Sequence, residues 1–123
     1  MSKEEKFKIE ELFHKGLREY ELMDYFEAHE IWEELWSDYY LEDRKFIQAL
    51  IQLSVSFVHI GNGNLIGAKN LLKKSKNKFL EFSGTHRGIN IKKLIKQIER
   101  VALDYENLEN TDNFEWDLVP KLD

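Results

Sequence analysis

The apolar residues of this chain recur with a helical period, and one stretch is apolar on nearly every face. From residue 46 to residue 68 there is no Asp, Glu, Lys or Arg, although these residues make up 33% of the chain. Within this stretch only Gln48, Gln52 and His59 fall together on one narrow polar strip of a helix. A helix that is apolar nearly all round is typically buried, and buried polar groups need partners. We therefore expect a buried central helix whose polar strip faces another element.

The same periodicity predicts four more helices around this central one. They are expected over residues 2–23, 24–40, 65–82 and 90–109. Three residues stand where N-caps belong, namely Ser2, Asp24 and Asp43. The sequence GNGN at 61–64 is the clearest break, and SGTHRG at 83–88, which contains His86, is expected to be a loop. Residues 110–123 alternate large apolar and polar positions, as an extended tail laid on the body would.

Length and composition favour one soluble helical domain over residues 1–123. The chain has one proline and no cysteine, which favours long helices and excludes disulfides and thiolate chemistry. Its start, MSKEEKFKIEE, is too acidic for a signal peptide, and the apolar run 46–60 is too short and too polar to cross a bilayer. We expect a cytoplasmic all-α bundle of about five helices.

A faint internal repeat indicates stacked helical hairpins. Ala28 and Ala68 each lie just inside a second helix and are 40 positions apart. Gly16 and Trp32 fit the spacing of a tetratricopeptide repeat in part. We expect slight tetratricopeptide-like character, without a full solenoid.

Charge is distributed unevenly along the chain. Residues 1–45 carry a net charge of −7, residues 69–100 carry +8, and residues 101–123 carry −6. A basic block can bind nucleic acid, and its exposed candidates are Lys69, Lys73, Lys76, Lys92, Lys93 and Arg100. The block lacks interleaved aromatic residues, so we expect it instead to complement the protein's own acidic segments.

The motif FEAHEIWEELW carries the candidate chemistry on the second helix. His29 is at the centre of an aromatic face with Trp32 and Trp36, Glu33 lies one turn further on, and Glu30 lies at the edge of this face. A buried carboxylate is costly without a partner. We therefore expect Glu33 to meet the polar strip of the central helix.

Three interpretations of this cluster stay open. His29, Glu33, Gln52 and His59 can form a structural hydrogen-bond network. The leading functional interpretation is a binding module, with a pocket or groove beside the two tryptophans that takes a small molecule or a protein partner.

The alternative is a hydrolase with a divalent metal ion bound by His29, Glu33 and His59, and with Glu30 as general base. The sequence reads H-E-x-x-E, however, and lacks the second histidine of zinc peptidases. No cofactor is firmly indicated, and the sequence leaves self-association open.

Three segments carry a resemblance to a known family: YFEAHEIWEELW, RKFIQALIQL and HIGNGNLIGAKNLL. Together they resemble the Domain of Unknown Function 309 family over roughly residues 10–82. The resemblance implies an all-α fold and no established activity. The positions it marks are Phe26, Glu27, His29, Glu30, Trp32, Glu33, Trp36, Gln48, Leu50, Ile51, Gln52, His59, Gly63, Asn64, Gly67 and Ala68.

Overall fold

The computed structural model describes all 123 residues as five α-helices followed by a C-terminal tail. The predicted all-α fold is confirmed, because the only strands are two residues long each. No helix is both long enough and apolar enough to cross a membrane. The elements are α1 (Lys3–Glu21), α2 (Tyr25–Asp38), α3 (Arg44–Gly61), α4 (Leu65–Phe79), β1 (Thr85–His86), β2 (Ile89–Asn90), α5 (Ile91–Asn107), and the 3₁₀ turns η1 (Thr111–Asn113) and η2 (Trp116–Leu118).

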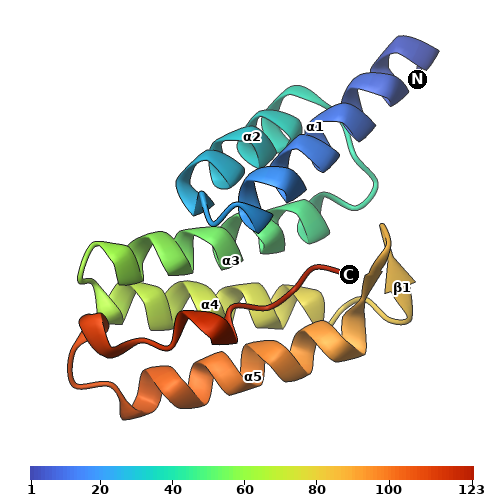
Figure 1. Cartoon of the computed structure of the whole chain (residues 1–123). Helices are drawn as coiled ribbons and strands as arrows, with labels where there is room; N and C mark the ends of the chain where they lie inside the picture. Colours follow the sequence, from blue (N-terminus) through green and yellow to red (C-terminus); the bar gives the residue numbers. More distant parts are fainter.

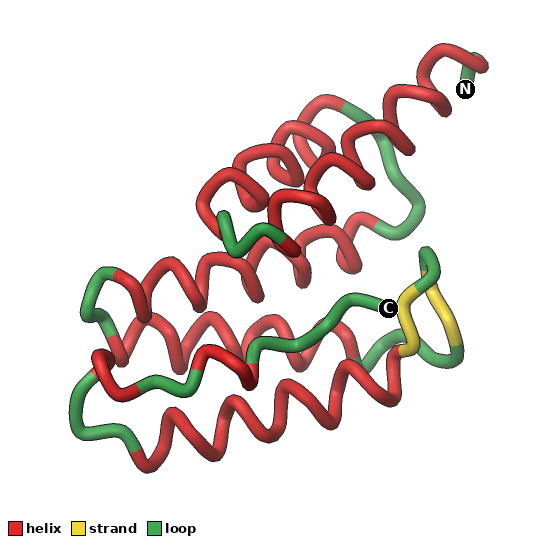
Figure 2. Tube along the Cα trace, in the orientation of Figure 1, coloured by secondary structure: helices red, strands yellow, loops and turns green.

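The helices stack as two hairpins and a fifth helix. Figure 1 shows α1 beside α2, with α3 and α4 forming a second pair beneath them. α5 packs against α4, and the tail returns along α5 in the opposite direction (Figure 2). α3 therefore lies in the middle of the molecule, as its apolar sequence predicts.

The two hairpins turn in the same way, 40 residues apart along the chain. Met23 (φ 65°) and Gly63 (φ 77°) both hold a left-handed backbone. The next residue in each turn, Asp24 or Asn64, caps the following helix by accepting a hydrogen bond from the backbone N–H three residues on, at 3.1 and 2.9 Å. The expected repeat is thus present in the backbone, but Met23 stands where the second turn uses glycine.

α3 and α4 approach closely because small residues line their contact. Ser75 Oγ donates to the carbonyl of Ala49 (2.7 Å), and Ser56 Oγ donates to the carbonyl of Ala68 (2.8 Å). All four residues are fully buried. Since Ser56 uses its hydrogen on Ala68, the Tyr105 hydroxyl of α5 donates to Ser56 Oγ at 2.8 Å. These bonds join α3, α4 and α5 with their hydroxyl groups satisfied.

Trp32 is a core residue and does not form the wall of an open pocket, in contrast to the expectation from the sequence. Its side chain is 0% exposed, and its indole N–H donates to the carbonyl of Phe13 (3.2 Å). The ring lies directly against Gly16, where a Cβ would come within 2.2 Å of Trp32 Nε1. Gly16 and Trp32 therefore set the spacing between α1 and α2.

The end of the tail is held by both α1 and α5. The Tyr20 hydroxyl at the end of α1 donates to the Pro120 carbonyl (2.7 Å), and burial raises the pKa of Tyr20 well above its ordinary value. The Lys121 backbone N–H donates to Gln97 Oε1 of α5 (2.9 Å). The tail includes two 3₁₀ turns, so it is less extended than the alternating pattern predicts.

We expect Gly16→Ala to lower the free energy of unfolding by about 1–3 kcal/mol, because the new methyl group overpacks the Trp32 contact. Urea denaturation followed by circular dichroism measures this. Gly61→Ala is the matched control, since nothing lies within 4 Å of a Cβ built there. Equal midpoints for the two variants would contradict the close Gly16–Trp32 contact.

Candidate functional site

The predicted seam between α2 and α3 forms at one end only. The Arg44 guanidinium lies over the Trp36 ring, 4.3 Å from its centroid, and Arg44 Nη2 donates to the Trp36 carbonyl (3.3 Å). The two helices run antiparallel. His29 lies about two turns before Trp36 on α2, and Gln52 lies about two turns after Arg44 on α3, so His29 and Gln52 are at the same level. The polar strip of α3 thus follows the motif helix, as expected.

Glu33, in contrast, is exposed and has no hydrogen-bond or ion-pair partner in the protein. The expectation of a buried Glu33 that meets the polar strip is therefore wrong. Gln48 and Gln52 are both half-buried. Gln52 Oε1 and Arg44 Nε are buried without partners. The contact between α2 and α3 is consequently partly open to solvent on its polar side. It lacks the closed hydrogen-bond network that the sequence predicts.

The two histidines of the cluster bind residues of their own helix or of the turn that follows it. His29 Nδ1–H donates to the Phe26 carbonyl (2.6 Å), and His29 Nε2 faces Glu30 Oε1 at 3.6 Å. The His29 ring also packs edge-on against the Phe26 ring, at a centroid distance of 5.0 Å. His59 accepts a long hydrogen bond of 3.4 Å from Asn64 in the α3–α4 turn. Neither histidine bonds to the other or to the α3 glutamines.

The three proposed metal ligands are therefore not brought together. Glu33 points into solvent, His29 is held by Phe26, and His59 is held by the next turn. The structure contains no group of three or more His, Cys, Asp or Glu side chains placed to hold a metal ion. The hydrolase alternative, with Glu30 as its base, gains no geometric support, because it rests on that ligand set.

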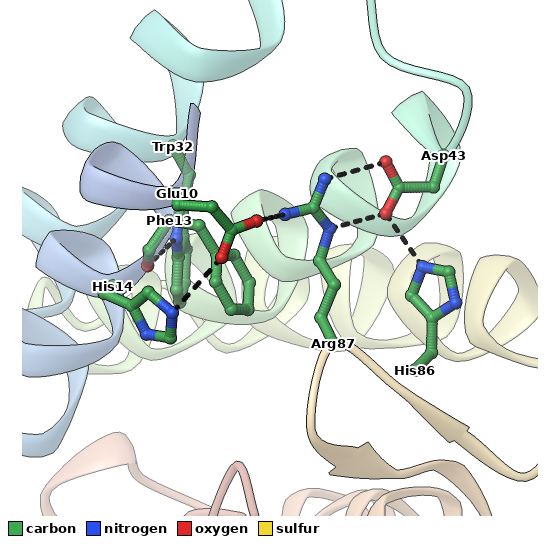
Figure 3. Close-up of polar contacts among 7 residues, drawn as sticks. All are labelled: Glu10, Phe13, His14, Trp32, Asp43, His86 and Arg87. Atoms are coloured by element: carbon green, nitrogen blue, oxygen red, sulfur yellow. Dashed lines mark hydrogen bonds and ion pairs between the residues drawn. The ribbon is translucent and has the colours of Figure 1, made fainter. Parts of the chain in front are cut away.

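A second polar cluster, which the sequence did not predict, joins the β1–β2 hairpin to the start of α3 (Figure 3). Arg87 donates to both oxygens of Asp43, at 2.6 and 3.1 Å, and His86 Nε2–H donates to Asp43 Oδ2 at 2.8 Å. The His86 ring packs against the rings of Phe46 and Phe82, at centroid distances of 4.4 and 4.9 Å. Residues 83–88 were expected to form a loop, but a hairpin brings both cations to one carboxylate.

The Asp43 carboxylate is ionised more readily than a free one. Burial acts to raise the pKa of Asp43, but the hydrogen bonds and positive charges of Arg87 and His86 outweigh it and leave that pKa below its ordinary value. Asp43 is the N-cap residue of α3, as predicted, but its side chain makes no capping bond. It ties three segments together instead, since Arg87 also reaches Glu10 of α1 at 3.6 Å.

An apolar groove lies where the α1–α2 turn, the end of α3 and the tail meet. It consists of two hollows of about 390 and 400 Å³ that share Met23, Tyr25 and Trp116 as lining residues. Phe26 and Val58 line the second hollow. The tryptophan stacks on Tyr25 at a centroid distance of 6.0 Å. We call these five residues the apolar groove.

The other main hollows lie away from the predicted site. The largest, about 750 Å³, lies at the N-terminal end of α1 and is lined mostly by charged and polar residues of its first turns. None of the five main hollows is lined by Trp32, Trp36, Gln48 or Gln52. None of the main hollows is therefore the expected pocket beside the two tryptophans.

The basic region on α4 and α5 is partly neutralised by the protein itself. The three ion pairs that involve its candidate residues are Lys69–Glu106 (4.0 Å), Lys76–Glu99 (3.2 Å) and Lys93–Asp123. Lys73, Lys92 and Arg100 remain exposed and without an ion-pair partner. Half of the candidate nucleic-acid contacts thus complement acidic residues of the same chain.

Residues 13–71 match the sequence model of the family described as Domain of unknown function (DUF309). This segment runs from the middle of α1 to the middle of α4 and includes the whole of α2 and α3, so the central part of the chain is similar to that family. No curated protein and no solved structure matches the chain. The resemblance inferred from the motifs is confirmed, and it adds no activity.

We expect Asp43→Asn to lower the free energy of unfolding by about 1–3 kcal/mol at neutral pH, since it leaves Arg87 and His86 without their counter-ion. The lowered pKa of Asp43 makes its contribution complete above the unfolded-state pKa of about 4. The contribution is lost as pH falls through the lower folded-state value. Urea denaturation at pH 7 and about pH 3 should therefore show the difference from the unsubstituted protein shrink in acid. Glu42→Gln, at an exposed neighbour of Asp43, should show no such pH dependence.

Proposed function

We propose that this DUF309 domain is a binding module that takes a polypeptide partner in the apolar groove. The observation that carries the proposal is the exposure of Phe26 and Met23, each 57% exposed, at the edge of that groove. Single exposed apolar side chains are common on protein surfaces, but contiguous ones beside a hollow mark interaction sites. Leu22, 73% exposed, extends this patch along the α1–α2 turn.

The motif histidine supports the exposed phenylalanine. His29 contacts Phe26 twice, through the backbone carbonyl and through the ring. Both contacts hold the first turn of α2 and limit the rotamers of Phe26, which reduces the entropy lost when a partner binds. This gives the F-E-x-H part of the motif a role in presenting a surface, where the sequence had offered a buried network or a metal site.

Met23 supports the same conclusion from its backbone. A left-handed conformation costs a non-glycine residue about 1 kcal/mol or more, and the equivalent turn of the second hairpin uses Gly63. Met23 thus keeps an unfavourable backbone conformation, and its large flexible side chain lines both hollows. Methionine and aromatic side chains are enriched in the cores of protein interfaces.

Peptides selected from a random library on the immobilised protein should bind in the groove. We expect their affinity to fall at least about tenfold in the Met23→Ala/Phe26→Ala double variant, because two central anchors are lost. Isothermal titration calorimetry measures this. Leu103→Ala is the matched control, since Leu103 is 66% exposed on α5 and does not line the groove. Equal losses in both variants, or no loss in either, would count against the groove.

Met23→Gly separates stability from binding. Glycine adopts a left-handed backbone without a steric cost, so we expect the free energy of unfolding to be unchanged or raised by up to about 1 kcal/mol. The same substitution should weaken the selected peptides, because it removes the methionine side chain from both hollows. A variant that is markedly less stable would show that Met23 serves folding instead.

A further inference from the structure

The segments that form the apolar groove are rich in acidic residues. Residues 119–123 of the tail line part of it, and its other lining residues come from three segments, namely residues 19–30, 55–68 and 109–117. The first contains five Asp or Glu residues, the last contains four, and none of the three contains a Lys or Arg. Two of these nine carboxylates, Glu21 and Asp117, line the groove together with Asp123, and Lys121 is its one basic lining residue. The field at the groove is therefore negative.

These carboxylates are not neutralised by the protein's own cations. None of the nine is within 4.0 Å of a lysine or arginine, and only Glu30 has an ion-pair partner, His29. The lysines that form ion pairs bind carboxylates outside this set of nine, namely Glu11, Glu81, Glu99, Glu106 and Asp123. Lys121 is the one basic residue that lines the groove, in the same hollow as Glu21 and Asp117.

We infer that the occupant of the apolar groove is an amphipathic segment of another protein that carries Lys or Arg beside bulky apolar residues. The inference rests on the proposed function and specifies the partner's chemistry. The two hollows, which meet at Met23, Tyr25 and Trp116, take apolar side chains from one face of the segment. The acidic residues of the groove then attract the basic residues that flank them.

The same charges argue against two other occupants. An acidic segment would bring like charges together at the rim, which costs binding free energy. A lipid surface is disfavoured, because membranes with anionic headgroups attract basic patches and would repel this acidic one. A second copy of the chain has a basic surface on α4 and α5, and it is therefore an outcome that the experiment must separate.

Three synthetic 16-residue peptides test the inference. Each has the same Leu and Phe residues on one helical face, and the other face carries Lys, Gln or Glu. We expect the Lys peptide to bind the full-length protein at least about tenfold more tightly than the Glu peptide, with the Gln peptide between them. The ratio should shrink as salt rises from about 0.05 to 0.5 M, because salt screens exposed charges.

Matched charge reversals locate the effect. Glu21→Lys/Asp117→Lys should reduce the ratio between the Lys and Glu peptides severalfold, because both residues line the groove. Glu34→Lys/Glu42→Lys changes the net charge equally at exposed sites outside the three segments and should leave the ratio nearly unchanged. Equal changes in the two double variants would overturn the inference, since only the overall charge would then matter.

The remaining outcomes separate this inference from the proposed function. If all three peptides bind equally and lose affinity in Met23→Ala/Phe26→Ala, the groove binds polypeptides but the basic partner is wrong. If none binds, and library-selected peptides also fail, the proposed function itself is wrong. If the protein is a salt-sensitive dimer in sedimentation analysis, and the Lys peptide dissociates it, the occupant is a second copy of the chain.

Discussion

The structure depends on how the buried central helix satisfies its polar groups. α3 is enclosed by neighbours on several sides, and every hydroxyl or amide it carries must find a partner or cost free energy. On the α4 side the demand is met by small residues, since Ser56 and Ser75 bond to carbonyls across a close helix contact. On the α2 side it is met only in part, through Arg44 and Trp36. The contact with α4 fixes the second hairpin. The contact with α2 leaves the polar edge of α3 partly open to solvent.

The repeated hairpin turn explains why the functional surface lies where it does. Both turns have a left-handed residue at the same position, followed by a residue whose side chain caps the next helix. The second turn uses Gly63 and presents no side chain, whereas the first presents Met23 beside Phe26. The turn of the α3–α4 hairpin thus presents no large apolar side chain, whereas the turn of the α1–α2 hairpin carries an exposed apolar surface.

The family motif divides between these two roles. Ala28 and Trp32 are fully buried and hold α2 against its neighbours, with Trp32 seated on Gly16. Phe26, Glu30 and Glu33 face solvent on the same helix. A helical motif of this kind therefore combines residues that build the fold with residues that face a partner, and only burial distinguishes the two sets.

The sequence by itself determined the helices, the caps at Ser2 and Asp24 and the central position of α3, because apolar periodicity and capping residues are local properties of the chain. It also indicated the family and the repeat. Only the tertiary structure decided that Glu33 is exposed, that Trp32 belongs to the core and that Asp43 pairs with Arg87 and His86. A helical projection gives the relative directions of side chains, but what each one meets depends on how closely the neighbouring helices approach. That approach is set by contacts between segments far apart in the chain, such as Gly16 with Trp32, and no local pattern encodes them.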